Sequence, residues 1–153
     1  LALKPYCRHV TAVDADEPAI KTLEAHLIKG VTAICGDVEA LTPKEPYDAM
    51  VFCLFGRTED TLRIARKRCR GRIFLVKRDY SHHRFSAGKV SLGEYTAGST
   101  EAVLHEKGVP YTVERFTAEF GQPFRSLEAA ERFLHSITEV EVKRSPRMRS
   151  KRA

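Results

Sequence analysis

Two aspartates stand where acidic side chains can bind a nucleoside. Asp14 closes the apolar run HVTAVD, and Asp37 follows the run VTAIC in a Gly36-Asp37 turn. A carboxylate at the end of one strand can accept hydrogen bonds from both hydroxyls of a ribose, and a carboxylate at the next strand end can accept from an adenine amino group. Each aspartate is also an ordinary turn or cap residue. Their occurrence at two successive strand ends favours the nucleoside interpretation.

A second polar cluster, KRDYSHHRF, lies just beyond a later apolar run. His82 and His83 are the candidates for a general base, because an imidazole exchanges a proton near neutral pH. Tyr80 is suited to orienting a substrate, and Arg78 or Arg84 to holding an anion. Adjacent histidines in a polar loop are also commonly solvated and without a role. No third ligand has a suitable spacing, so we predict no metal site.

The cysteines indicate a reducing compartment. Cys7, Cys35, Cys53 and Cys69 form no CxxC pair, and we expect reduced thiols in a cytoplasmic protein. Cys53 ends an apolar run, where a buried core thiol is expected in preference to a nucleophile. No apolar run reaches the length of a transmembrane helix, and no signal peptide is recognisable, so we expect no membrane contact.

The net charge of +6 is located in one short segment. Residues 143–153 read KRSPRMRSKRA, with six basic and no acidic residues, so that residues 1–142 contain 20 basic and 20 acidic side chains. We therefore expect one folded domain over 1–142 and a basic, disordered tail over 143–153. A neutral body favours a small-molecule substrate over nucleic acid.

The elements that must position these residues alternate between strand and helix. Apolar, β-branched runs predict strands at 9–14, 31–35, 48–54 and 72–77. Helices are predicted from Asp16 or Glu17 to Lys29, then at 58–70, 99–107 and 126–137. The apolar face of the first helix would comprise Ile20, Leu23, Leu27 and Ile28.

The order of these elements predicts the fold class. Residues 78–97 are polar and read as a loop, whereas 110–120 alternates as an antiparallel edge strand does. Alternating strands and helices form a mainly parallel sheet that is covered by helices. We therefore expect an α/β protein with a doubly wound, mainly parallel sheet and a late antiparallel strand.

Three segments carry a resemblance to a known family. HVTAVDADEPAI, CGDVEAL and YDAMVFCLFG resemble, in this order and spacing, the second, third and fourth motifs of class I, Rossmann-like S-adenosylmethionine-dependent methyltransferases. The resemblance covers about residues 1–77, and the order of elements fits the family to about residue 120. It implies methyl transfer from S-adenosylmethionine to an acceptor that the sequence does not identify.

The resemblance also implies a set of cofactor-binding residues. Asp14 would bind the ribose, with Ala15 beside it. Asp37 would contact the adenine amino group, and Val38 would supply a backbone contact. The segment of Cys53, Leu54 and Phe55 would lie near the reactive methyl group.

The sequence departs from the family at its amino-terminal end. The family's first strand and its Gly-rich loop, which approaches the methionine part of the cofactor, should precede LALKPY, and no such loop is present. We expect either a missing amino-terminal segment or self-association through the apolar surface that the absent strand and helix would cover. Two other classes stay open: a non-catalytic or partner-binding Rossmann-like domain, and a fragment of a nicotinamide-binding oxidoreductase.

Overall fold

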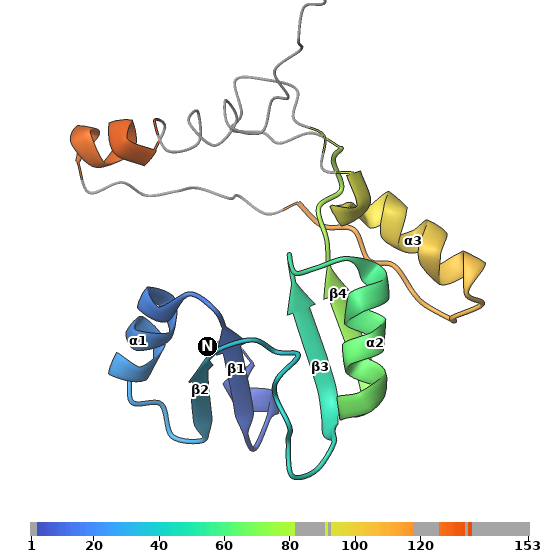
Figure 1. Cartoon of the computed structure of the whole chain (residues 1–153), viewed down its shortest axis with the longest axis horizontal. Helices are drawn as coiled ribbons and strands as arrows, with labels where there is room; N and C mark the ends of the chain where they lie inside the picture. Colours follow the sequence, from blue (N-terminus) through green and yellow to red (C-terminus); the bar gives the residue numbers. More distant parts are fainter. Residues whose placement is uncertain (1–2, 82–90, 92, 118–125, 134, 136–153) are drawn as a thin grey trace, which may run out of the picture. The chain divides into compact units, whose positions relative to one another are not determined.

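The computed structural model describes residues 3–81, 91, 93–117, 126–133 and 135 (Figure 1). The chain divides into two compact units, Leu1–Cys53 with Glu59–Leu75, and Leu54–Thr58 with Val76–Ala153. Two strand–helix–strand segments follow each other along the first unit, which confirms a mixed α/β class. The predicted tail at 143–153 lies outside the described residues.

The first strand pair consists of β1 (Val10–Asp14) and β2 (Val31–Cys35). The two strands are parallel, with Val10 opposite Val31 and Asp14 opposite Cys35. Their β-branched residues suit extended backbone, and α1 (Glu17–Ala25) supplies the crossover that parallel strands require. Both strands therefore end at the same edge of the pair.

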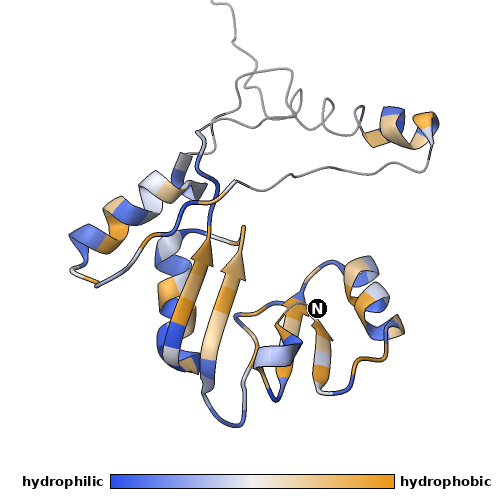
Figure 2. Ribbon diagram, turned by 180° about the vertical axis from the view of Figure 1, so that it is seen from behind, coloured by the Kyte–Doolittle hydropathy of each residue, from blue (hydrophilic) through white to orange (hydrophobic). Residues whose placement is uncertain are grey.

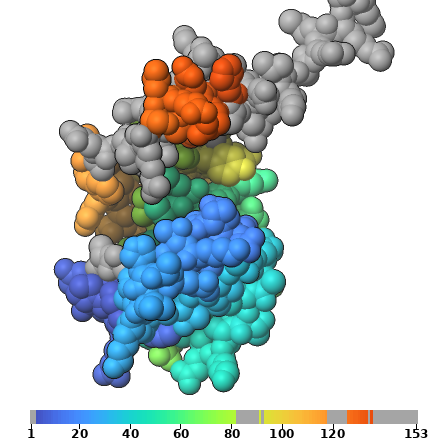
Figure 3. Space-filling view, turned by 90° about the vertical axis from the view of Figure 1, so that its left-hand side faces the viewer, coloured from blue at the N-terminus to red at the C-terminus, as the bar shows by residue number. Residues whose placement is uncertain are grey.

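Helix α1 is shorter than the sequence predicts. Pro18 lies in its first turn as expected, where its missing N–H costs little. The helix ends at Ala25, however, and Leu27 has a left-handed backbone with φ 47° and is 89% exposed. The predicted continuation to Lys29 is therefore wrong, and Leu27 is not part of the buried face. Helix α1 and the residues that follow it lie at the surface (Figure 3).

The second strand pair consists of β3 (Tyr47–Cys53) and β4 (Cys69–Val76), joined by α2 (Thr58–Arg68). These bounds agree with the predicted ones to within three residues. Phe52, Ile64 and Ala65 form the buried core of this region. The partly buried residues around it are Val38, Met50, Cys69 and Leu75.

The second unit contains η2 (Gly93–Tyr95) and α3 (Ala97–Glu106). Helix α3 begins two residues before the predicted start, because Thr96 caps it by accepting from the Ser99 N–H at 3.1 Å. A further helical stretch at 127–133 begins, as predicted, after Ser126, whose hydroxyl accepts from the Ala129 N–H at 3.2 Å. Among the described residues, no helix is both long and apolar enough to cross a membrane.

The late antiparallel strand is not formed over its described part. Residues 110–117 have no strand partner, and residues 118–120 lie outside the description. Tyr111, Val113 and Phe116 alternate in sequence, yet all three are exposed. Alternation alone does not make a strand, because backbone pairing requires a neighbour in space.

The four predicted strands form two separate sheets of two strands each. The order is β1–β2 in one and β3–β4 in the other, with no pairing between the two sheets among the described residues. The strands are largely apolar, except that β4 begins with a hydrophilic stretch (Figure 2). Parallel strands of this composition are normally buried on both faces.

Candidate functional site

Asp14 lies at the carboxyl end of β1 and is exposed. Its Oδ1 accepts a hydrogen bond from the Asp16 N–H at 2.9 Å, and its carbonyl oxygen accepts from the Gly36 N–H at 2.9 Å. No described residue engages Oδ2. The carboxylate is thus oriented by its own turn and retains an oxygen for a ligand.

Asp37 stands two residues beyond the end of β2 and repeats this arrangement. Its Oδ1 accepts from the Glu39 N–H at 2.8 Å, and its carbonyl oxygen accepts from the Ala40 N–H at 3.1 Å. Because Asp14 and Cys35 are paired, both carboxylates belong to the same edge of the β1–β2 pair. We call this edge, with Asp14, Ala15, Asp37 and Val38, the nucleoside edge. Whether its four residues bind a cofactor stays a prediction.

The turn that carries Asp37, residues 36–41, is held firmly to α2. Val38 packs against the core of Phe52, Ile64 and Ala65. The Arg63 guanidinium donates to both carboxylate oxygens of Glu39, at 2.9 and 2.7 Å. A bidentate pair of this kind fixes direction as well as distance.

A second arginine of α2 holds the backbone of the same turn. Arg68 Nε donates to the Leu41 carbonyl oxygen at 2.6 Å, and its Nη2 donates to the Glu39 carbonyl oxygen at 2.5 Å. These two carbonyl groups have no helix or strand to pair with, so the guanidinium satisfies them. The Asp37 turn is therefore fixed at its side chains and at its backbone.

The pKa values of Glu39 and Arg63 follow from the geometry of their ion pair. The hydrogen bonds from Arg63 hold the pKa of Glu39 below its ordinary value, with burial acting in the opposite direction. The same pair raises the pKa of Arg63, and Asp60, at 3.2 Å from Nη2, adds to the effect. Both partners are partly exposed, so the pair orients the turn more than it stabilises the fold.

Cys53 is the last residue of β3 and is exposed, so the predicted buried core thiol is wrong. All four cysteines are free, as expected. Among the described residues no group of three or more metal-ligating side chains is present.

Leu54 and Phe55 begin the loop Leu54–Thr58, which belongs to the second unit. Leu54 has φ 52°, a left-handed conformation that costs a branched side chain about 1–2 kcal/mol. Its N–H donates to the Val76 carbonyl oxygen at 3.0 Å. Strained residues of this kind persist where the surroundings hold them, frequently at functional sites.

Lys77 holds this loop from the end of β4. Its Nζ donates to the carbonyl oxygens of Phe55 and Gly56, at 2.8 and 2.7 Å. Burial lowers the pKa of Lys77. The position of Leu54 and Phe55 therefore depends on a half-buried ammonium group. His82 and His83, the candidate bases, lie outside the described residues.

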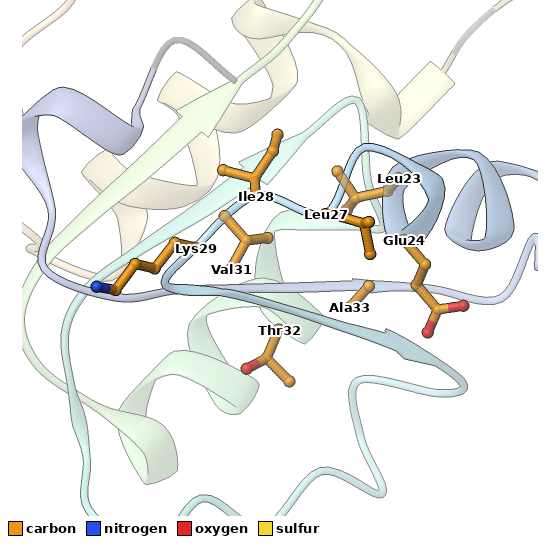
Figure 4. Close-up of a pocket in the computed structure, with 8 residues that line it drawn as sticks. All are labelled: Leu23, Glu24, Leu27, Ile28, Lys29, Val31, Thr32 and Ala33. Carbon is orange, nitrogen blue, oxygen red and sulfur yellow. The ribbon is translucent and has the colours of Figure 1, made fainter.

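A hollow of about 550 Å³ opens elsewhere, between the end of α1 and β2 (Figure 4). Leu23, Leu27, Ile28, Val31 and Ala33 form its apolar lining, with Glu24, Lys29 and Thr32 at polar positions. Most of this lining belongs to the amino-terminal half of β2 and the chain before it. The hollow therefore does not coincide with the nucleoside edge, which lies at the carboxyl end.

Comparisons with known proteins name no family. No protein-family model matches the sequence, and no curated protein or solved structure shows significant similarity to it.

The anchoring residues were not found by sequence reasoning. Glu39 and Arg63 are far apart in the chain, and neither stands in a recognisable motif. The one local signal was Asp60, three residues before Arg63 on the same helix face. Side chains that act from a distant helix become visible only when the fold places them.

Proposed function

We propose that the chain is the nucleoside-binding part of a Rossmann-like methyltransferase that uses S-adenosylmethionine. Asp14 accepts from the ribose hydroxyls, and Asp37 accepts from the adenine amino group. Ala15 and Val38 flank the purine. The donor is a sulfonium, so methyl transfer needs little more than in-line positioning and a base for the acceptor.

One observation carries the proposal. The carboxylates of Asp14 and Asp37 lie in turns at the same edge of one parallel strand pair. Each has one oxygen that accepts no hydrogen bond from a described residue. Ligands of open parallel sheets bind at this edge, outside the carboxyl ends of the strands. Carboxylates at the ends of two paired strands are able to contact the ribose and the adenine of one nucleoside.

The two strand pairs fit the two halves of a doubly wound sheet. In such a sheet the chain runs outward from a central strand in both directions. A further parallel strand between β1 and β3 would join β2–β1 to β3–β4 in this order. We propose that the two strand pairs are the two halves of one such sheet, and that self-association covers their free edges.

The acceptor is proposed to be a small molecule, because the basic excess of the chain lies in its last eleven residues and not in its body. His82 or His83 is the proposed base. The free cysteines agree with the cytoplasm as the proposed location.

The proposal makes a specific prediction about ligand preference. The proposed contacts are all to the nucleoside half of the cofactor, and none of them is to its methionine half. Adenosine, S-adenosylhomocysteine and S-adenosylmethionine should therefore bind with similar, weak affinity, with Kd on the order of 1 mM or about −4.1 kcal/mol. NAD should bind no better than adenosine. Titrations followed by NMR at millimolar ligand test this.

Variants of the nucleoside edge sharpen the test. Asp14→Asn should weaken adenosine binding by about 1.5–3 kcal/mol, the contribution of a hydrogen bond to a charged group. Glu45→Gln, which removes an exposed carboxylate elsewhere, is the matched control. Equal affinity of Asp14→Asn and wild type would refute the ribose role.

Gly36 offers a variant that separates folding from binding. A Cβ at this position would meet nothing within 4 Å, and its φ is not left-handed, so the fold does not require glycine there. If a ligand approaches this backbone closely, Gly36→Ala should weaken adenosine binding without lowering the melting temperature. Preferential binding of NAD would favour the oxidoreductase, and binding of no nucleoside would favour a partner-binding domain.

A further inference from the structure

The proposed site depends on a turn whose shape β2 alone does not determine. Asp37 lies in an exposed turn, and its bond to the Glu39 N–H is the only described contact of its side chain. Gly36 on one side and Ala40 on the other give the turn little side-chain mass of its own. The direction of the carboxylate must therefore come from what holds residues 38–41.

These residues are held almost entirely by α2. The carboxylate of Glu39 is held by two bonds from Arg63, and the carbonyl oxygens of Glu39 and Leu41 are held by Arg68. Val38 is held by the core against Ile64 and Ala65. Three independent kinds of contact thus join one helix to one turn.

Helix α2 is in turn part of the other strand pair. It connects β3 to β4, and its Ile64 and Ala65 pack against Phe52 of β3. The arginines consequently link the turn after β2 to the β3–β4 pair, although the two pairs share no backbone hydrogen bonds among the described residues. A nucleoside site at the first pair is then positioned from the second.

We infer that Arg63 and Arg68 are positioning residues that set the orientation of Asp37. Arg63 does so through its ion pair with the carboxylate of Glu39. The inference rests on the proposed function for its effect on ligand affinity. Its structural part, the dependence of the Asp37 turn on Arg63, can be measured without any ligand. The residues act through the Glu39 backbone, because the same N–H that donates to Asp37 belongs to the residue that Arg63 holds.

The test uses the full chain labelled with ¹⁵N and a set of variants. Arg63→Gln and Glu39→Gln each remove the ion pair, and the double variant removes both partners. Arg66→Gln is the matched control, since Arg66 is exposed on the same helix and makes no described ion pair. The amide resonances of residues 37–40 report the turn, and titration with adenosine reports the affinity.

We expect Arg63→Gln to shift the Glu39 and Asp37 amide resonances and Glu39→Gln to shift that of Asp37. Each should weaken adenosine binding by about two- to tenfold, the loss of one well-placed hydrogen bond. The double variant should be no worse than either single one, because the two residues act as a unit. Arg63→Lys, which keeps the charge but not the bidentate geometry, should give an intermediate effect. The exchange Glu39→Arg with Arg63→Glu should restore part of the affinity.

Amide resonances of residues 37–40 that are the same in Arg63→Gln as in Arg66→Gln would overturn the inference. If Arg63→Gln does not fold, Arg63→Lys and Glu39→Gln decide the question by the same resonances. A wild-type chain that shows no adenosine binding would contradict the proposed function, whereas the positioning of the turn would still be decided by the resonances alone.

Discussion

Gly71 is the position at which the structure makes its sharpest prediction about stability. A Cβ on Gly71 would overlap the carbonyl oxygen of Asp48 and lie 3.1 Å from its carbonyl carbon. Both atoms belong to backbone, so no flexible side chain can move away. β4 can therefore run beside β3 at this point only because residue 71 has no side chain.

The cost of Gly71→Ala can be worked out from these contacts. Overpacking costs about 1–3 kcal/mol when side chains can adjust, and a backbone obstacle places this change at the upper end. The reduced entropy of the unfolded chain returns about 0.4–1 kcal/mol. We therefore expect a net loss of about 2 kcal/mol. With a urea dependence of about 1–3 kcal/mol per molar, the unfolding midpoint should fall by about 1 M.

The matched control is Gly98→Ala in α3, where a Cβ would meet nothing within 4 Å. This variant should be neutral or more stable by up to about 1 kcal/mol, because alanine is the better helix former. Urea unfolding followed by circular dichroism compares the two variants. Equal midpoints for Gly71→Ala and wild type would refute the close approach of β4 to Asp48, near the beginning of β3.

Three further predictions concern the buried core, the carboxylate of Glu39 and the exposed apolar residues of β3 and β4. Ile64→Ala removes a side chain that is 1% exposed and should lower the free energy of unfolding by about 2–5 kcal/mol. Arg66→Ala, at the surface of the same helix, should change it by less than about 0.5 kcal/mol. Similar losses in the two variants would contradict the described core. The lowered pKa of Glu39 means that its contribution is complete above its ordinary pKa and is lost as pH falls through the lowered one. Acid below about pH 4.5 should therefore shift the amide resonances of the Asp37 turn more in wild type than in Glu39→Gln. Val51 and Phe74 are 47% and 48% exposed, on strands that have an unpaired edge among the described residues. We therefore expect sedimentation to show a dimer or a larger species. A monomer at all concentrations would refute self-association.

Local signals predicted the elements of the first unit well. The apolar, β-branched runs that end at Asp14 and Cys35 became β1 and β2, and Pro18 marked the first turn of α1. These features depend on neighbouring residues only. The position of Asp14 and Asp37 at one edge followed from them, because parallel strands end together.

Features that depend on distant partners could not be predicted in the same way. Leu27 fits the apolar spacing of a helix, yet the chain leaves the helix at Ala25 to reach β2. Phe116 lies in an alternating segment that has no strand partner in the described part. The ion pair of Arg63 with Glu39 likewise forms only because α2 packs against the Asp37 turn. Pairing and anchoring are properties of the three-dimensional arrangement, which periodicity does not encode.

We propose above that a nucleoside binds at the carboxyl ends of β1 and β2. The most direct test is to add adenosine to the ¹⁵N-labelled chain and to map which amide resonances move. We predict that the amide resonances of Ala15, Gly36 and Val38 shift and saturate at the same adenosine concentration. Asp37→Asn should suppress these shifts. Shifts confined to Leu23 and Thr32, at the hollow beside α1, or shifts at no residue, would contradict it.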